Sequence, residues 1–300
     1  MFRDDRAMEN KNYLYRNYIS IARRCVEEKN DIKALKFYKK AYDLEIGKND
    51  IELLLDMALL YDKIGLKDNA IKRYLEVIDI DNTYANAYYG IGVIYDEMQE
   101  YDKAIEYYDK AIKYNPNYDK AYFFLANIYD ELGQKEKAID YYKKCITIND
   151  KDIWAYANVG CIYEEIGDNS TALEYHKKAL NLDNKDYRLL FNMGVILRKL
   201  NKIDESIEYY KKSIDNNRYY PNAYLNLAVL YKDLNEYDKA IDILSEGIDN
   251  TDEDYLYYHR GCTYVKMGNI DLGRKDIGKS IELNDFFIEY SKQDKDLEDL

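Results

Sequence analysis

A repeating pattern of 34 residues runs through most of this 300-residue chain and constrains the fold more than any other feature. The third and fourth copies show it best, since residues 87–112 read AYYGIGVIYDEMQEYDKAIEYYDKAI and residues 121–146 read AYFFLANIYDELGQKEKAIDYYKKCI. Repeats of this length with two helical patterns are typical of helical solenoids, in which each unit buries its apolar face by stacking on its neighbours. We therefore expect a stack of helical hairpins.

Small residues set the frame of the repeats. Position 8 is glycine or alanine, position 20 is alanine, serine or glycine, and tyrosine recurs at positions 11 and 24. Two helices would approach closely at the small residues and enclose the rings. The residue between the two helical patterns is often one that tolerates the positive φ of a helix-ending turn: Gly65, Gly133, Gly167, Gly268, Asn201 or Asn235. The resulting repeats are 15–48, 51–84, 85–118, 119–152, 153–186, 187–220, 221–253 and 254–287.

This pattern resembles the tetratricopeptide repeat family in its length, its small residues and its aromatic positions. The resemblance implies an all-α, right-handed superhelical solenoid of about eight antiparallel helix-turn-helix repeats, continuous over residues 15–287. Residues 1–14 would be a lead-in, and residues 288–300 a capping helix with an acidic tail. The proline that the family carries at position 32 survives only as Pro116. Asn or Asp stands there in several other copies and can also end a helix by local hydrogen bonding.

Charge and composition exclude several classes of function. The formal net charge of −13 disfavours nucleic acid and anionic membranes as partners. No apolar stretch is long enough to span a bilayer, and the start MFRDDRAMENKN lacks a signal-peptide core, so we expect a cytoplasmic protein. Four scattered cysteines and two histidines form neither a disulfide framework nor a metal site, and no cofactor is expected.

No motif for catalysis stands out. Phosphate-binding loops, metal-hydrolase motifs and serine-nucleophile motifs are missing from the sequence. His176 falls at core position 24, where tyrosine stands in other copies, and is interpreted as a core residue rather than a general base. The eighth repeat is irregular, with Arg260 at the usually apolar position 7. We therefore expect a noncatalytic protein.

In the tetratricopeptide family the first helix of each hairpin lines a concave groove through positions 2, 5, 6, 9, 12 and 13. Positions 5 and 9 are mostly apolar in this chain, and the stripe includes Leu55, Leu59, Tyr89, Val93, Phe123, Phe191, Val195, Leu225 and Val229. Such a stripe either packs within the stack or contacts a partner. We favour the groove because positions 4, 7, 8 and 11 already supply the apolar face of each hairpin.

Amide side chains recur in the same face. Asn158, Asn192 and Asn226 occupy position 6 of three successive repeats, and Asn127 lies at position 9 one repeat earlier. An amide can pair with both the C=O and the N–H of an extended peptide. This row is similar to the asparagine ladder with which some family members hold peptide backbone. The same side chains could instead bond a neighbouring helix.

Two further residues are candidates for ligand contact. Trp154, the only tryptophan, falls at position 2 and is expected at the groove rim, either as a contact residue or as part of the core. Arg188, with Asn127 and Asn158, matches part of the carboxylate clamp of chaperone-binding family members. Phe123 and Asn192 replace the remaining basic residues of that clamp, which disfavours a chaperone C-terminal carboxylate as the ligand.

Acidic doublets end the first helices of repeats three to five, and the next repeat reverses the sign. The doublets are Asp96 with Glu97, Asp130 with Glu131, and Glu164 with Glu165, followed by Arg198 with Lys199. Anions in the last turn of a helix cost about 0.3–1 kcal/mol each, so helix stability does not explain them. They form either a solvated acidic surface or a site for a partner segment carrying Lys or Arg, with an acidic group near Arg188 and Arg198.

These features predict a noncatalytic scaffold that binds an extended or helical segment of another protein in its groove. One alternative is a peptide-sensing regulator, which we rank lower because only about 14 residues precede the first repeat and an effector domain needs more. A second alternative is an accessory subunit that recruits substrate to an enzyme encoded elsewhere. Apolar patches near the terminal repeats would also permit end-to-end self-association.

Overall fold

The computed structural model describes residues 2–293, with side chains for residues 10–292, and is all-helical over that range. The chain divides into two compact units, Met1–Asp150 and Lys151–Leu300, which we treat one at a time. A single continuous domain over residues 15–287 stays a prediction. Residues 294–300, which belong to the expected capping helix and acidic tail (288–300), lie outside the described residues.

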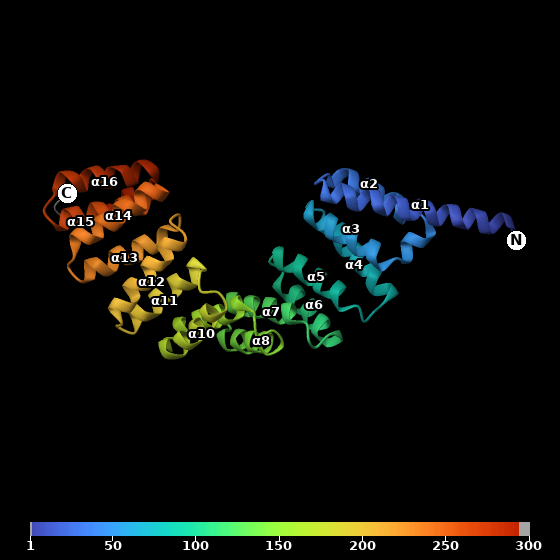
Figure 1. The fold of residues 1–300 in the computed structure, drawn as a ribbon, viewed down its shortest axis with the longest axis horizontal. Helices are drawn as coiled ribbons and strands as arrows, with labels where there is room; N and C mark the ends of the chain where they lie inside the picture. The colour runs from blue at the N-terminus through green and yellow to red at the C-terminus, as the bar shows by residue number, and fades with distance from the viewer. Residues whose placement is uncertain (1, 294–300) are drawn as a thin grey trace. The chain divides into compact units, whose positions relative to one another are not determined.

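The first unit is a stack of helical hairpins (Figure 1). Its elements are α1 (Phe2–Glu27), α2 (Asp31–Tyr42), the 3-10 helix η1 (Glu45–Asn49), α3 (Ile51–Lys63), α4 (Lys67–Ile80), α5 (Ala85–Glu97), α6 (Tyr101–Tyr114), α7 (Asp119–Glu131) and α8 (Lys135–Ile148). Each odd-numbered helix packs on the helix that follows it, and each hairpin contacts the next. Helices α3, α5 and α7 begin at the first residues of the expected repeats, whereas α1 already begins within the expected lead-in.

The second unit repeats this arrangement (Figure 1). Its helices are α9 (Ile153–Glu165), α10 (Asn169–Leu182), α11 (Tyr187–Lys199), α12 (Ile203–Asn216), α13 (Pro221–Asp233), α14 (Tyr237–Thr251), α15 (Asp254–Lys266), α16 (Ile270–Leu283) and α17 (Phe286–Gln293). Hairpins form between α9 and α10, α11 and α12, α13 and α14, and α15 and α16, and α17 packs on α16.

A close approach between the two helices of a hairpin explains the glycines at position 8. A methyl group on Gly92 of α5 would lie 2.7 Å from the ring of Tyr108 in α6, and one on Gly194 of α11 would lie 2.6 Å from the ring of Tyr210 in α12. Both rings are fully buried. Because protein interiors are close-packed, the ring takes the space that a Cβ atom would need.

Every turn within a hairpin uses one residue of left-handed conformation. Glycine or asparagine fills this position at the six places that the sequence indicates. Lys29 and Gln99 occupy it in the first and third repeats, with φ of 57° and 58°, without any such indication in the sequence. The residue after the turn returns its N–H to the end of the first helix, as Glu100 N does to the Tyr95 carbonyl at 2.9 Å. This is the Schellman pattern, which satisfies the last carbonyls of a helix.

Apolar residues at repeat positions 3 and 10 join each hairpin to the one before it. Ala87 and Ile94 of α5 are buried in one apolar cluster with Tyr74 of α4. The first repeat carries Asn17 and Arg24 at these positions, and both are exposed. Polar residues therefore face the N-terminal side of the first hairpin, which disfavours stacking of a second copy there. End-to-end self-association stays a prediction.

The last helix covers one end of the second unit. Phe287 of α17 is 6% exposed and stacks on Tyr258 of α15, with ring centroids 4.9 Å apart. Tyr258 is therefore only 2% exposed, although it lies at position 5 of its repeat. Helix α17 thus buries an apolar stripe residue that a further repeat would otherwise cover.

The unusual Arg260 lies in a nearly buried ion pair within the last hairpin. Its guanidinium donates to both carboxylate oxygens of Asp276, at 2.6 and 2.9 Å, and to Ser245 Oγ at 2.9 Å. Bidentate pairing of this kind satisfies both charges away from water. The arginine is accommodated at an apolar position because α14 and α16 supply its acceptors.

Candidate functional site

An apolar hollow of about 300 Å³ lies on the first helices of the second and third repeats, in the first unit. Leu55 and Leu59 of α3 and Tyr89 and Val93 of α5 line it. These are the stripe residues at positions 5 and 9. Leu59 is 60% exposed, while the other three side chains are half-buried. At these two repeats the stripe residues therefore line a cavity, while residues at other positions pack the helices against one another.

The rest of the lining was not predicted from the sequence. Tyr74 reaches the hollow from α4, and its ring packs against Gly90. A methyl group on Gly90 would lie 2.4 Å from the Tyr74 ring, so no larger residue fits there. Tyr118, at position 34, lies with its ring centroid 4.9 Å from that of Tyr89. Tyrosine also ends the second and sixth repeats, and this recurrence could have indicated the wall.

A carboxylate lies in the same hollow. Asp62 of α3 lines it, and its Oδ1 is buried with no hydrogen-bond partner among the described residues. Burial raises the pKa of Asp62 above its ordinary value, Glu97 raises it further, and Lys67 lowers it. The site therefore combines aromatic and aliphatic walls with one poorly solvated acid.

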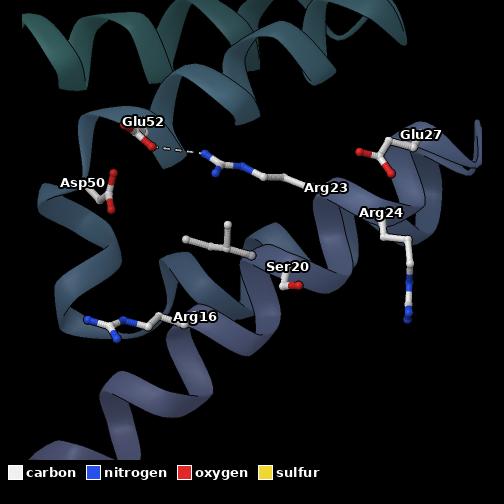
Figure 2. A pocket seen from close by; sticks show the side chains of 8 residues that line it. Arg16, Ser20, Arg23, Arg24, Glu27, Asp50 and Glu52 are labelled. Carbon is white, nitrogen blue, oxygen red and sulfur yellow. Dashed lines mark hydrogen bonds and ion pairs between the residues drawn. The ribbon is translucent and has the colours of Figure 1, made fainter.

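A larger hollow of about 550 Å³ lies at the first repeat (Figure 2). Its lining includes four residues at inner positions of α1 that are not among the predicted contact residues: Arg16, Ile19, Ser20 and Arg23. Arg23 reaches across to Glu52 at 3.3 Å and donates to Asp56 at 2.9 Å, whereas Arg24 points away from Glu52 (Figure 2). Three arginines and three carboxylates line this hollow, so its charges balance internally.

In the fourth repeat, two predicted contact residues are engaged within the first unit. Phe123 is half-buried, and its ring meets those of Phe124 and Tyr142 edge-on, with centroids 5.6 Å apart in both pairs. Tyr142 donates its hydroxyl hydrogen to Oδ1 of Asn127. Asn127 therefore holds the core ring of its own hairpin. Whether it also contacts peptide stays a prediction.

Acids at position 13 join one repeat to the repeat before it. Lys67 donates to Glu97, and Tyr101 donates to Glu131. The same contact joins the first and second repeats with the charges exchanged. There the base is at position 13, and Lys63 Nζ donates to Asp31 Oδ1 at 2.8 Å. The second members of two acidic doublets are thus accounted for by contacts within the chain.

Residues at position 12 have contacts of their own. Asp96 accepts from the hydroxyl of Tyr108 at 3.2 Å, and Asp130 accepts from Lys135 at 2.7 Å. Burial raises the pKa of Asp96, while the Tyr108 hydrogen bond lowers it. In the second unit Lys199 donates to Glu164, and Arg198 donates to Asp233 at 2.5 Å. A basic partner segment opposite these residues stays a prediction.

Trp154 and Arg188 form a stacked pair in the second unit. The guanidinium carbon lies 4.1 Å from the centre of the indole ring, and the indole is 37% exposed. Asp186, which caps the start of α11, accepts from Arg188 at 3.2 and 2.8 Å. The guanidinium is therefore held over the ring by a cation–π contact and by two hydrogen bonds to one carboxylate.

The predicted row of amides lies half-buried on α9, α11 and α13. Asn192 Nδ2 lies 3.7 Å from Cys161 Sγ, and Asn226 Nδ2 donates to the carbonyl of Asn222 at 3.0 Å. Asn158 occupies the corresponding place on α9. Phe191 is half-buried and meets Tyr220 edge-on at 5.3 Å. Peptide contact through these amides stays a prediction.

His176 is 1% exposed in the core of the fifth repeat. Neither ring nitrogen has a hydrogen-bond partner in the described part of the chain, and burial lowers the pKa of the ring to about 4. The interpretation of His176 as a core residue is confirmed. Among residues 2–293, no three His, Cys, Asp or Glu side chains are grouped to bind a metal, and no helix has the length and apolarity to cross a bilayer.

Comparisons with protein families identify the repeat. Models of the tetratricopeptide repeat match residues 67–99, 85–118, 119–152, 155–186, 197–262 and 255–286. Tyr74, Tyr89 and Tyr118 of the hollow fall within these segments, whereas Leu55, Leu59 and Asp62 precede the first of them. In the second unit Asn158 and Asn226 fall within them, and Arg188 and Asn192 do not. The comparison with curated proteins gives no match.

Solved structures share the fold. The crystal structure of MamA is 34% identical with a TM-score of 0.50, over 55% of this chain and 95% of that one. YrrB, described as a TPR protein with an unusual peptide-binding site, is 22% identical with a TM-score of 0.51, over 62% and 95% of the two chains. The APC/C hetero-tetramer Cut9–Hcn1 is 17% identical with a TM-score of 0.57, over 92% and 55%.

Proposed function

Because this chain belongs to the tetratricopeptide repeat family, we propose that it is a noncatalytic scaffold that holds a peptide segment of another protein against the first helices of its repeats. The observation that carries this proposal is the apolar hollow of the first unit. Leu59 stands 60% exposed beside it, and Leu55, Tyr89 and Val93 complete its apolar wall. Concave, mostly apolar sites with a few polar groups are typical of ligand binding.

The position of these residues in the repeat supports binding. The hairpins are closed by other positions, since Ala87 and Ile94 join the repeats and Tyr108 fills the space over Gly92. Leu59 adds little to that core. Burying such a side chain is worth roughly 1.5–3 kcal/mol, and an occupant of the hollow would gain part of it.

The second unit offers a different set of contacts. Trp154 with Arg188 presents a partly exposed aromatic and cationic surface, and Phe191 and the amides of Asn158, Asn192 and Asn226 lie on the same row of helices. Aromatic rings and arginine are enriched among residues that dominate binding energy. We propose that these residues contact peptide within this unit, with the amides pairing to its backbone.

Selection of displayed random peptides tests the hollow directly. Leu59→Glu places a charge at its rim, while Leu75→Glu places the same charge on α4, outside the lining, where the leucine is 41% exposed. We expect peptides enriched on the wild-type chain to lose binding to Leu59→Glu and to keep it with Leu75→Glu. Equal binding to all three proteins would reject the hollow as the site. For the second unit, the triple alanine variant of Asn158, Asn192 and Asn226 is the corresponding test, and undiminished binding would reject the amide row.

A further inference from the structure

The acids at repeat position 12 of the first unit differ in their hydrogen bonding. Asp62, Asp96 and Asp130 occupy this position in three successive repeats. Asp96 is bonded to Tyr108 and Asp130 to Lys135. The Oδ1 atom of Asp62 is buried and has no partner among the described residues. Buried carboxylate oxygens are normally paired, so this atom calls for an explanation.

The lysine that lowers the pKa of Asp62 does not supply that partner. Lys67 lies close enough to lower the pKa of Asp62, yet its Nζ donates to Glu97. Glu97 carries a second negative charge near the hollow. Glu97 therefore makes the surroundings of Asp62 more negative, and no donor among the described residues bonds to its Oδ1 atom.

Three aromatic rings share the wall around this acid with Asn86 and the aliphatic side chains. Tyr89 and Tyr118 lie with ring centroids 4.9 Å apart, and the ring of Tyr74 fills the space left by Gly90. Burial raises the pKa of Tyr74 and Tyr118 to about 12, so both remain neutral phenols at physiological pH. The faces of neutral aromatic rings attract cations.

We infer that this hollow takes the side chain of a lysine or arginine from the bound segment. The inference rests on the proposed function and names the residue that the first unit recognises. The aliphatic stem of the side chain would pack on Leu59 and Val93, as long charged side chains commonly do on apolar surface. Its cationic head would face the tyrosine rings and the carboxylate of Asp62, which lines the hollow.

Other occupants fit the lining less well. An aliphatic side chain would fill the volume but would remove water from Asp62 without offering a hydrogen bond, which is costly for a charged group. An acidic side chain would meet like charge from Asp62 and Glu97. A cation gains from both the rings and the carboxylate.

Peptide pools measure this preference. Each fluorescent pool has one fixed central residue, either Lys, Arg, Gln, Glu or norleucine, among random uncharged residues, and binding to the full chain is followed by fluorescence anisotropy. We compare the wild type with Asp62→Asn and with Asp79→Asn, an exposed acid of α4 outside the hollow. Wild type and Asp79→Asn should bind the Lys and Arg pools about tenfold more tightly than norleucine. Asp62→Asn should lose most of that preference.

A second variant tests the rings. Tyr118→Leu removes one aromatic face at a half-buried site and should weaken the preference for Lys and Arg without removing Asp62. Circular dichroism establishes that each variant is helical. Norleucine binding as tightly as Lys, or a Lys preference that survives Asp62→Asn, overturns the inference and leaves the proposed function standing. If no pool binds the wild type, the proposed function fails and the inference fails with it.

Discussion

Replacing His176 with phenylalanine should remove an acid sensitivity that the fold carries in its core. His176 lies over Gly160, and a methyl group on that glycine would come within 2.9 Å of the imidazole. Tyr108 and Tyr210 occupy the same repeat position over Gly92 and Gly194, so a six-membered ring fits this site. The variant keeps the packing and removes two buried nitrogens that have no partner among the described residues.

The size of the effect follows from the lowered pKa. Burial lowers the pKa of His176 from 6.5 to about 4, so the folded chain holds the neutral ring. Between pH 6.5 and about 4 the unfolded chain binds a proton that the folded chain does not, and the free energy of unfolding falls by about 1.4 kcal/mol per pH unit. The loss reaches about 3 kcal/mol near pH 4 and stops below it, because both states are then protonated. Above pH 6.5 this contribution to stability is fully present.

Urea unfolding followed by circular dichroism at several pH values between 7 and 4 measures this loss. Carboxylates titrate in both proteins, so the difference between His176→Phe and wild type isolates the histidine. We expect that difference to grow by about 3 kcal/mol as the pH falls from 7 to 4. The chain has two histidines, so the His176 ring signal can be assigned by NMR from its loss in the variant. A constant stability difference, or a ring that titrates near pH 6.5 in the folded chain, would refute the reasoning.

Two other predictions concern the backbone and the core. Gln99→Gly should raise the free energy of urea unfolding by about 1 kcal/mol, and Gly133→Ala should lower it by a similar amount, because only glycine adopts positive φ without strain and a methyl group at Gly133 meets no neighbour within 4 Å. Asp276→Ala should lower the melting temperature strongly, with a loss of about 3 kcal/mol, because Arg260 would stay nearly buried without its carboxylate. Replacing both residues with leucine should recover most of that loss.

Much of the fold could be predicted because each packing position of the repeat occurs in several copies, and the copies can be compared. One glycine at position 8 is ambiguous, but glycine or alanine in every copy there, with a large ring at position 24 of most copies, indicates two helices in contact. Two of the turn residues could not be predicted in this way. Lys29 and Gln99 adopt positive φ although neither residue type favours it, because the two helices on either side impose the turn. Local propensity cannot reveal a conformation that tertiary packing enforces.

The candidate site was only half predictable for a related reason. Leu55, Leu59, Tyr89 and Val93 share a spacing, and spacing indicates which residues share a helix face. Tyr118 approaches the hollow from the far end of a repeat, and its contact with Tyr89 depends on how the chain enters the next helix. The missing partner of Asp62 is invisible in the sequence, since Asp96 and Asp130 occupy the same repeat position and do have partners.

The two acids of each acidic doublet, at positions 12 and 13, make different contacts, and the sequence alone does not tell them apart. Position 13 joins successive repeats, and the pair of Lys63 with Asp31 shows that either order of charges serves this contact. Exposed ion pairs contribute up to about 1 kcal/mol, so Asp31→Lys alone should lower the free energy of urea unfolding by about 0.5 kcal/mol, because it sets two lysines side by side. Adding Lys63→Asp should recover the part of the loss that comes from the two facing lysines, while a cation at the start of α2 and an anion at the end of α3 keep the double variant below the wild type. If the double variant is no more stable than Asp31→Lys, the ion pair between successive repeats does not explain the charge at position 13.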